Sequence, residues 1–160
     1  METTFVCRPY DPADDALRQK NLQAVIGYMT AAGEDRLERW KLFEPSDETT
    51  LTLGFAAQQE PVVNRGIRCI RQTNESYVRD FPDWSFQNLV VRLTGDPNII
   101  FVEADGAGTS LKQGTEERAS SQHSEHSLHR FICKDGKILH YTEFMNPINE
   151  LLKLGYQMPY

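Results

Sequence analysis

The residue in this sequence that best fits acid–base chemistry is Glu143, which lies in a predicted β-hairpin. The hairpin covers Ser124–Asn146, two apolar runs joined by Asp135-Gly136. An Asp-Gly pair between apolar runs is typical of a type I′ turn, because both positions of that turn need a positive φ. Apolar surroundings disfavour the charged form of a carboxyl group, so Glu143 could act as a general acid or base near neutral pH. The alternative is a structural ion pair with Arg130.

Counting strand positions from the Asp-Gly turn predicts which side chains surround Glu143. Side chains alternate between the two faces of a strand, and the turn sets Lys134 opposite Lys137. One face then carries Leu128, Arg130, Ile132, Leu139, Tyr141, Glu143 and Met145, and the other carries Phe131, Cys133, Ile138 and Phe144. Because both faces are largely apolar, the sheet needs a second cover, and we expect a homodimer formed through it.

All four histidines lie in the last quarter of the chain, at His123, His126, His129 and His140. On a helix the spacing HxxHxxH would place ligands on one side and suggest zinc. The flanking pattern is that of a strand, where His126 points away from His123 and His129. We therefore expect no metal site, and a neutral histidine could instead line a pocket and pass protons.

Two arginines, Arg36 and Arg39, lie beside Trp40 on a short helix predicted over Glu34–Phe43. In one interpretation they belong to a solvated helix face, with Leu37 and Trp40 turned inward. In the other, a guanidinium group binds a substrate carboxylate, for which its fork of N–H donors is well suited.

Composition limits the classes of protein that this chain can belong to. It has 160 residues, a net charge of −6 and 39% hydrophobic residues, which indicates one domain with a real core. The acidic balance argues against nucleic acid and against anionic membranes as partners. No apolar run is long enough to span a bilayer, and the first residues lack the pattern of a signal peptide. Three widely spaced cysteines fit reduced thiols, so we expect a cytoplasmic protein.

Helical and strand periods alternate along the chain in an order typical of an α+β fold. Helices are expected over 11–33, 34–43 and 67–81, and strands over 49–55, 61–64, 84–93 and 99–104. Gly106, Gly108 and Gly114 predict a flexible connection with a polar tail over 113–122, and a last helix is expected from Asn146-Pro147 to Gly155. The single domain, 1–160, would begin with an arm (1–12) and end in a tail (156–160). We expect the helices to cover one face of a curved sheet.

Five short stretches carry a resemblance to a known family. They are GEDRLERW (33–40), FPDW (81–84), VEADGAG (102–108), DGKI (135–138) and EFMN (143–146). In this order and spacing the chain resembles the phenazine-biosynthesis A/B proteins, which are small dimeric members of the NTF2-like, ketosteroid isomerase-like superfamily. The likeness implies a cone of N-terminal helices closed over a curved, mixed and mostly antiparallel sheet, with a pocket inside.

The resemblance also implies a reaction. Two molecules of a 6-amino-5-oxocyclohexene carboxylic acid would condense into a tricyclic phenazine precursor by forming two imines with loss of water, and no cofactor is implied. Two rival functions stay open. One is a cyclase or isomerase with the same fold that acts on another carbonyl substrate, and the other is a binding or scaffolding partner, such as a paralogous subunit, in a pathway complex.

Roles for single residues follow from the same resemblance. The catalytic glutamate of EFMN corresponds to Glu143, and the substrate-binding arginine of the DRLxR helix corresponds to Arg39. Where the family has a histidine, a serine and a tyrosine, this sequence has Thr73, Tyr77 and His123, and we expect these and Tyr141 to contact substrate. Because Thr73 cannot protonate an imine, His123 or Tyr77 would replace it, the substrate would differ, or the chain would be a weakly active paralogue.

Overall fold

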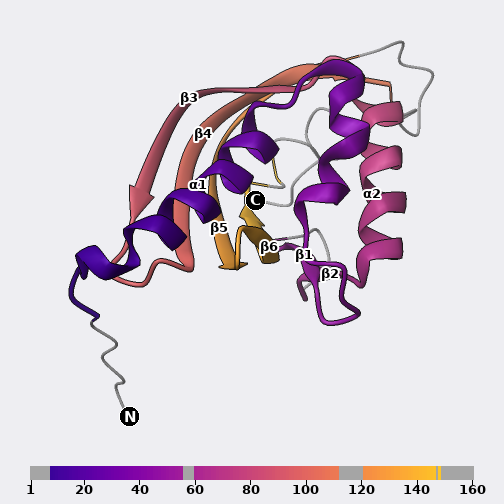
Figure 1. Ribbon diagram of the computed structural model, residues 1–160. Coiled ribbons are helices and arrows are strands. Elements are labelled where there is room, and N and C mark those ends of the chain that lie inside the picture. Colours follow the sequence, from indigo (N-terminus) through magenta and orange to yellow (C-terminus); the bar gives the residue numbers. More distant parts are fainter. Residues whose placement is uncertain (1–7, 56–59, 112–120, 147, 149–160) are drawn as a thin grey trace.

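The computed structural model describes residues 8–55, 60–111, 121–146 and 148 (Figure 1). Its helical elements are η1 (Pro12–Asp14), α1 (Asp15–Thr30), η2 (Gly33–Leu42) and α2 (Ile67–Asp80). Its strands are β1 (Thr50–Leu53), β2 (Val62–Arg65), β3 (Ser85–Leu93), β4 (Ile99–Ser110), β5 (Ser121–Lys134) and β6 (Lys137–Phe144). The α+β prediction is therefore confirmed.

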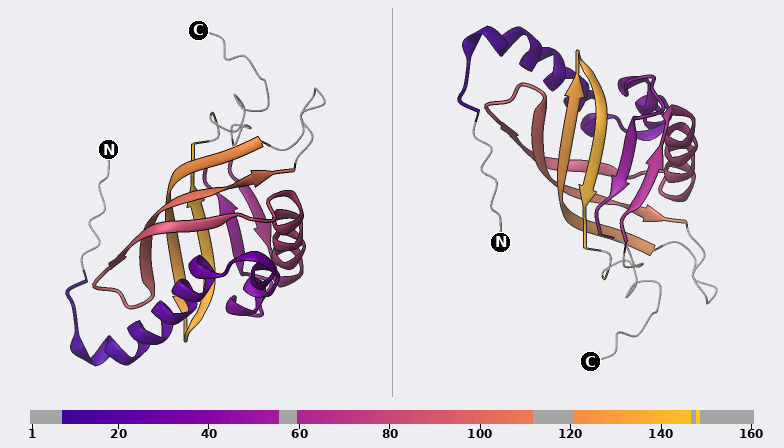
Figure 2. Two further views of the ribbon diagram at one scale, coloured as in Figure 1. Left: turned by 90° about the horizontal axis from the view of Figure 1, so that it is seen from above. Right: turned by 90° about the horizontal axis from the view of Figure 1, so that it is seen from below.

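The strands form one mixed sheet in the order β2-β1-β6-β5-β4-β3. Neighbours are antiparallel, except that β1 runs parallel to β6. Figures 1 and 2 show the sheet strongly curved, with α1 along its concave side and α2 beside η2 and the β1–β2 end. The core fills the space between helices and sheet, and its largest side chains include Tyr28, Phe43, Phe131, Ile138 and Tyr141. This is the cone that the resemblance implied.

The short η2 is a 3-10 helix whose two arginines are its buried residues. A 3-10 helix has about three residues per turn, so Arg36 and Arg39 lie on one face. Leu37 and Trp40 are only half-buried, which corrects the expectation that they alone turn inward. The interpretation of a solvated arginine face is wrong for the same reason.

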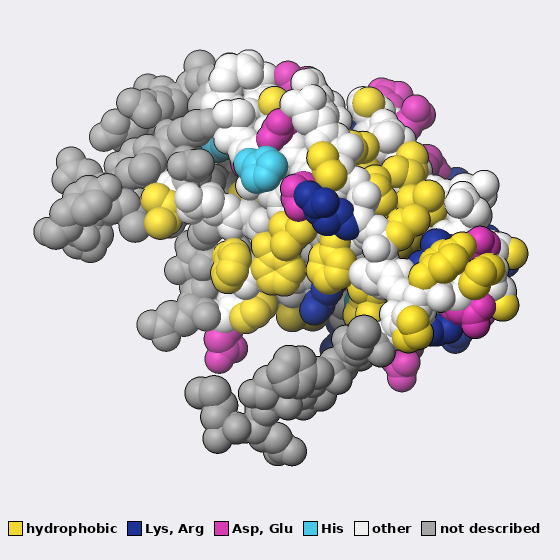
Figure 3. Space-filling view, turned by 90° about the vertical axis from the view of Figure 1, so that its left-hand side faces the viewer, with side chains coloured by type: hydrophobic (Ala, Val, Ile, Leu, Met, Phe, Trp, Pro, Cys, Tyr) yellow, Lys and Arg dark blue, Asp and Glu magenta, His cyan; other side chains and the backbone are white. Residues whose placement is uncertain are grey.

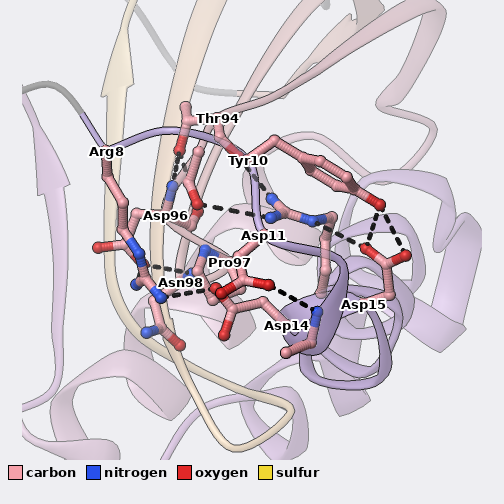
Figure 4. Close-up of polar contacts among 12 residues, drawn as sticks. Arg8, Tyr10, Asp11, Asp14, Asp15, Thr94, Asp96, Pro97 and Asn98 are labelled. Carbon is pink, nitrogen blue, oxygen red and sulfur yellow. Dashed lines mark hydrogen bonds and ion pairs between the residues drawn. The ribbon is translucent and has the colours of Figure 1, made fainter.

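The start of the described chain is tied to α1 and to the β3–β4 turn (Figure 4). Arg8 pairs with Asp14 at 2.6 Å, and the Tyr10 hydroxyl donates to the Asp15 carboxylate. Arg18 is buried and donates to the Thr94 carbonyl oxygen. These contacts fix the first helix against one end of the sheet.

Asn21 joins α1 to both hairpin turns that close this end of the cone. It is fully buried, its side-chain amide donates to Pro97 O at 3.0 Å, and its oxygen accepts from Gly136 N–H at 2.7 Å. Asn21→Leu would keep the volume but leave these groups unpaired, and we expect it to lower the free energy of unfolding by about 2 kcal/mol. Urea denaturation beside the exposed control Lys20→Leu measures this, and equal midpoints for the two variants would contradict it.

The hairpin turn is confirmed, but the strand register beyond it was mispredicted. Asp135 and Gly136 both have positive φ, and Lys134 pairs with Lys137. Cys133 then pairs with Ile138 while Ile132 pairs with His140, so a β-bulge leaves Leu139 as an extra residue in β6. The bulge moves every later pair by one position. Beyond it, Phe131 pairs with Tyr141, Arg130 with Thr142, His129 with Glu143 and Leu128 with Phe144.

Because of the bulge, the cross-strand neighbours of Glu143 differ from those that we expected. Leu128 and Arg130, which we expected beside Glu143, are exposed on the outer face. The inner face of β5 instead presents the odd-numbered residues from His123 to Cys133. Arg130 lies within hydrogen-bond distance of Thr142, so the structural alternative of an Arg130–Glu143 ion pair is not what the structure shows.

The glycines that predicted a flexible connection, Gly106 and Gly108, lie inside strand β4. A Cβ atom on Gly106 would come within 2.4 Å of the Trp84 ring, and one on Gly108 within 2.7 Å of the Trp84 backbone. These positions are glycine because Trp84 packs directly on the sheet there. The strand continues to Ser110 for this reason.

Several predicted segments lie outside the described residues. These are the first part of the arm (1–7), most of the polar tail (113–120) and the last helix beyond Asn146, although the Ile148 N–H donates to Asn146 Oδ1 as a capping side chain would. None of the helices in the described part of the chain combines the length and hydrophobicity needed to cross a membrane.

The outer side of the sheet carries exposed hydrophobic side chains among charged ones, as Figure 3 shows from the side of β3 and β4. Val90 and Leu128 are exposed there, next to the ion pair of Arg92 with Glu103. His126 lies on the same side and contacts Asp105. The alternation that we predicted for the histidines is confirmed, because His123 and His129 are buried on the inner side.

Candidate active site

A cavity opens between the helices and the concave side of the sheet. The empty space between its lining side chains, open mouth included, is about 860 Å³. The lining residues come from every layer of the cone: Tyr28, Arg36, Arg39, Leu53, Tyr77, Phe81, Trp84, Phe86, His123, Ser124, Glu125, Tyr141, Glu143, Met145 and Asn146. Aromatic rings and polar or charged side chains share this wall, as in small-molecule sites.

Glu143 lies near the end of β6 and lines the cavity with only 9% of its surface exposed. Burial, and secondly the negative charge of Glu125, raise its pKa to about 8, against the opposing effect of Arg39. A carboxyl group with this pKa exchanges its proton close to neutral pH. The structure thus places Glu143 in the surroundings that the sequence predicted, although with different neighbours.

Tyr141 and His129 form the polar layer behind Glu143. The Tyr141 hydroxyl is hydrogen-bonded to Glu143 and lies 2.8 Å from His129 Nδ1. The Tyr141 ring stacks on Phe131, at 4.8 Å between centroids. Burial raises the pKa of Tyr141 well above its ordinary value, so this phenol stays protonated. Tyr141 therefore lines the cavity, as expected, and holds one side of the carboxyl group.

Arg39 is one of the two arginines that line the cavity, with Arg36. One Nη donates to Ala31 O at 2.9 Å, and the guanidinium lies over the Tyr28 ring, 4.8 Å from its centroid. Its buried Nε has no hydrogen-bond partner among the described residues. Rigid stacking of a guanidinium with unused donors prepares it for a carboxylate ligand.

Arg36 has a different task, although it lies on the same face of η2. Its Nη1 donates to Phe81 O at 2.6 Å and to Pro82 O at 3.3 Å, so it holds the FPDW turn at the end of α2. Burial and, secondly, the neighbouring charge of Arg39 lower its pKa to about 10. Both arginines thus line the cavity, but Arg36 is tied to the FPDW turn whereas Arg39 is tied to Ala31 and Tyr28.

The three positions at which this chain departs from the family motif do not share one environment. Tyr77 and His123 line the cavity, and the His123 ring meets Phe81 edge-on at 5.8 Å. Thr73 is not among the lining residues, and its hydroxyl donates to Asn64 Oδ1 and Cys69 O, both at 3.0 Å. His123 is thus the histidine that the cavity wall contains.

Sequence reasoning missed several residues that shape the cavity, among them Tyr28, Phe86, Glu125 and His129. Tyr28 follows Asn21 by two helical turns, and both are buried on α1. Glu125 and His129 share the strand parity of His123, which was a usable signal. Among the described residues, no cluster of three or more His, Cys, Asp or Glu side chains could hold a metal ion.

Because Glu143 is protonated in the folded protein well above its pKa in the unfolded chain, it should weaken the fold as pH rises. Between about pH 4.5 and 8 the unfolded chain releases a proton that the folded protein keeps, so the free energy of unfolding falls. Glu143→Gln should therefore be more stable than the wild type at pH 8 by a difference on the order of a few kcal/mol, and nearly equal at pH 4. Urea denaturation at pH 4, 6 and 8 measures this, with the exposed Glu75→Gln as control.

These features define the class of protein: an α+β cone of the NTF2-like, SnoaL-like type, with a pocket on the concave side of its sheet. A solved SnoaL-like polyketide cyclase from Shewanella putrefaciens shares this fold, with a TM-score of 0.64 over 98% of this chain and 99% of that one, at 11% identity.

The chain belongs to the phenazine biosynthesis protein A/B family, whose model matches residues 7–160. It is 36% identical to the phenazine biosynthesis protein PhzB of Pseudomonas fluorescens over 92% of this chain and 88% of that protein. It is also similar to the crystal structure of a phenazine biosynthesis-related protein, PhzB2, from Pseudomonas aeruginosa. That match has a TM-score of 0.83 at 34% identity and covers 92% of this chain and 93% of the other.

Proposed function

We propose that this protein catalyses the condensation of two carboxylated cyclic aminoketones into a tricyclic phenazine precursor. The observation that carries the proposal is the shared placement of Glu143 and Arg39 in one aromatic-lined cavity. Membership of a phenazine biosynthesis family supports the substrate class. The polar groups supply an anchor for a carboxylate and a titratable acid, which is what this condensation needs.

In the proposed reaction, the amine nitrogen of one molecule attacks the ketone carbon of the other, and one proton passes from that nitrogen to the ketone oxygen, which gives a carbinolamine with a hydroxyl group. Protonated Glu143 gives its proton to the hydroxyl that leaves as water, and the resulting carboxylate takes a proton from the nitrogen. Each imine formation thus releases one water and returns Glu143 to its starting state. Arg39 binds a ring carboxylate and holds the reacting atoms together, and such orientation can lower a barrier by several kcal/mol.

His123 is our candidate for the second proton-transfer group, in place of the missing histidine at position 73. It lies on the inner face of β5 with its ring against Phe81, whereas the Thr73 hydroxyl is occupied by Asn64. This assignment favours a condensing enzyme with a relocated histidine over a weakly active paralogue.

The test is chemical. Freshly prepared aminoketone is incubated with and without the protein, and tricycle formation is followed by mass spectrometry. Acceleration by the wild type supports the proposal. No acceleration would favour a scaffolding role, and turnover of a different carbonyl compound with unchanged aminoketone would favour a cyclase or isomerase.

We also propose a homodimer joined through the outer side of the sheet. Val90 and Leu128 expose apolar surface there, and a second copy is the partner expected to cover it. Light scattering at micromolar concentration should give twice the mass of 18.3 kDa. Leu128→Glu should shift the measured mass toward that of the monomer. Leu111→Glu serves as the control, because Leu111 lies outside the part of the sheet that Leu128 contacts. A monomeric wild type would end the proposal.

A further inference from the structure

A chain of hydrogen bonds leads from Glu143 away from the cavity to a buried histidine. Tyr141 acts on Glu143 as a hydrogen-bond donor that lowers its pKa, and His129 Nδ1 lies 2.8 Å from the Tyr141 hydroxyl and 3.9 Å from Glu143 Oε1. His129 Nε2 lies 2.9 Å from Ser127 Oγ. His129 and Ser127 are buried and do not line the cavity. His129 therefore acts on a bound molecule through other residues, among them Tyr141, Glu143 and Phe86, whose ring it meets edge-on at 4.9 Å.

Each side chain in this hydrogen-bonded series, from protonated Glu143 to Ser127, can both donate and accept a hydrogen bond. A neutral imidazole has one N–H and one bare nitrogen, and either nitrogen can carry the proton. Burial and the charge of Arg39 lower the pKa of His129 to about 3, so the ring is neutral over the whole working range of pH. A neutral imidazole between the hydroxyls of Tyr141 and Ser127 therefore allows these hydrogen bonds to point either toward Glu143 or away from it.

Two arrangements satisfy all of these groups. When Glu143 is protonated, it donates to Tyr141, Tyr141 donates to His129 Nδ1, and Nε2–H donates to Ser127. When Glu143 has lost its proton, Tyr141 donates to the carboxylate, Nδ1–H donates to Tyr141, and Ser127 donates to Nε2. The second arrangement has one proton fewer, the one that left Glu143, and all ring and hydroxyl protons are conserved.

We propose that His129 is a positioning residue whose tautomer follows the protonation state of Glu143. This keeps Glu143 hydrogen-bonded to Tyr141 both as an acid and as a base, without movement of heavy atoms. The inference rests on the acid–base role of Glu143 in the proposed function, but its test needs no substrate.

Other side chains near Glu143, Tyr141 and His129 do not fix the direction of these hydrogen bonds. The charged and titratable side chains that act on Glu143, Tyr141 or His129 are Arg39 of η2, Glu125 of β5, Tyr28 of α1 and Tyr77 of α2. Tyr28 is a hydrogen-bond partner of Tyr141. Its hydroxyl can donate to Tyr141 in both arrangements.

The test is nitrogen-15 NMR of the histidine rings in the full chain, titrated from pH 6 to 10 without substrate. We expect the Nδ1 and Nε2 shifts of His129 to exchange between bare and protonated values at the midpoint of the Glu143 titration, which carbon-13 labelling of glutamate reports. Glu143→Gln should lock one tautomer throughout. A single tautomer in the wild type, or an exchange that persists in Glu143→Gln, would overturn the proposal.

Tyr141→Phe tests whether the coupling passes through the hydroxyl. Phenylalanine keeps the stacking on Phe131, and the signal of exposed His126 reports whether the protein is folded. The His129 tautomer should no longer follow pH, and the Glu143 midpoint should rise, because the bond from Tyr141 favours the carboxylate. A tautomer that still follows pH would exclude Tyr141 as the link. If the condensation assay fails while the exchange is seen, only the proposed function is lost.

Discussion

Replacement of Glu143 by glutamine is expected to lower the condensation rate by about 10²–10⁴-fold, the usual contribution of a positioned general acid or base. Glutamine keeps the shape of the side chain and can still hydrogen-bond Tyr141, but it has no proton to transfer. The binding of substrate should change little, because Arg39 is untouched. Single-turnover measurements with excess protein separate the chemical step from binding.

The pH dependence gives a second readout of the same residue. If protonated Glu143 starts each imine-forming step, the wild-type rate should fall as pH rises through about 8. The residual rate of Glu143→Gln should lack this fall. Glu75→Gln, on the exposed surface of α2, should behave as the wild type in both respects. Equal rates for wild type and Glu143→Gln would remove Glu143 from the mechanism.

The predicted gain in stability of Glu143→Gln gives the rate loss a physical interpretation. A variant that is less active and more stable at pH 8 cannot owe its inactivity to unfolding. It would show that the fold accepts a cost in stability in order to hold a desolvated acid in its pocket, as active sites often do.

The elements of this fold could be predicted because their signals are local. The Asp-Gly turn, the amphipathic pattern of α2 and the buried alternation of β4 all act within a few residues. The bulge at Leu139 could not be read in this way, since it depends on how β6 fits the curved sheet. One extra residue was enough to replace Leu128 and Arg130 by His129 as neighbours of Glu143.

The polar interior was the least predictable part of the molecule. Arg18, Asn21, Arg36 and Arg39 look like surface residues on a helical pattern, yet all four are buried. Their partners are mostly backbone carbonyl oxygens of distant turns, such as Pro97 and Phe81, which no sequence spacing reveals. The residues themselves indicated Glu143 and the pair Arg36 and Arg39 as candidates, and the family resemblance chose Arg39 of the two, whereas the electrostatic coupling of Arg39 with Glu143 came only from the structure.

Substitutions of Arg39 can separate the effect of its positive charge on substrate binding from the effect of its planar guanidinium geometry. Arg39→Met keeps an apolar side chain against Tyr28 and Phe86, but removes the charge and the fork of donors. Loss of a charged hydrogen-bonding partner for a ligand carboxylate costs about 1.5–3 kcal/mol, so we expect KM to rise about 10–100-fold. The exposed Arg68→Met on α2 is the matched control.

Arg39→Lys tests the guanidinium geometry alone, because lysine keeps a positive charge but lacks the planar fork of N–H donors. Without the charge, as in Arg39→Met, the Glu143 midpoint should rise above about 8, because Arg39 favours the carboxylate. In Arg39→Lys the midpoint should stay near the wild-type value while KM still rises. A rise in KM for Met but not for Lys would mean that a point charge is enough for substrate binding. Unchanged KM in both variants would remove Arg39 from the site.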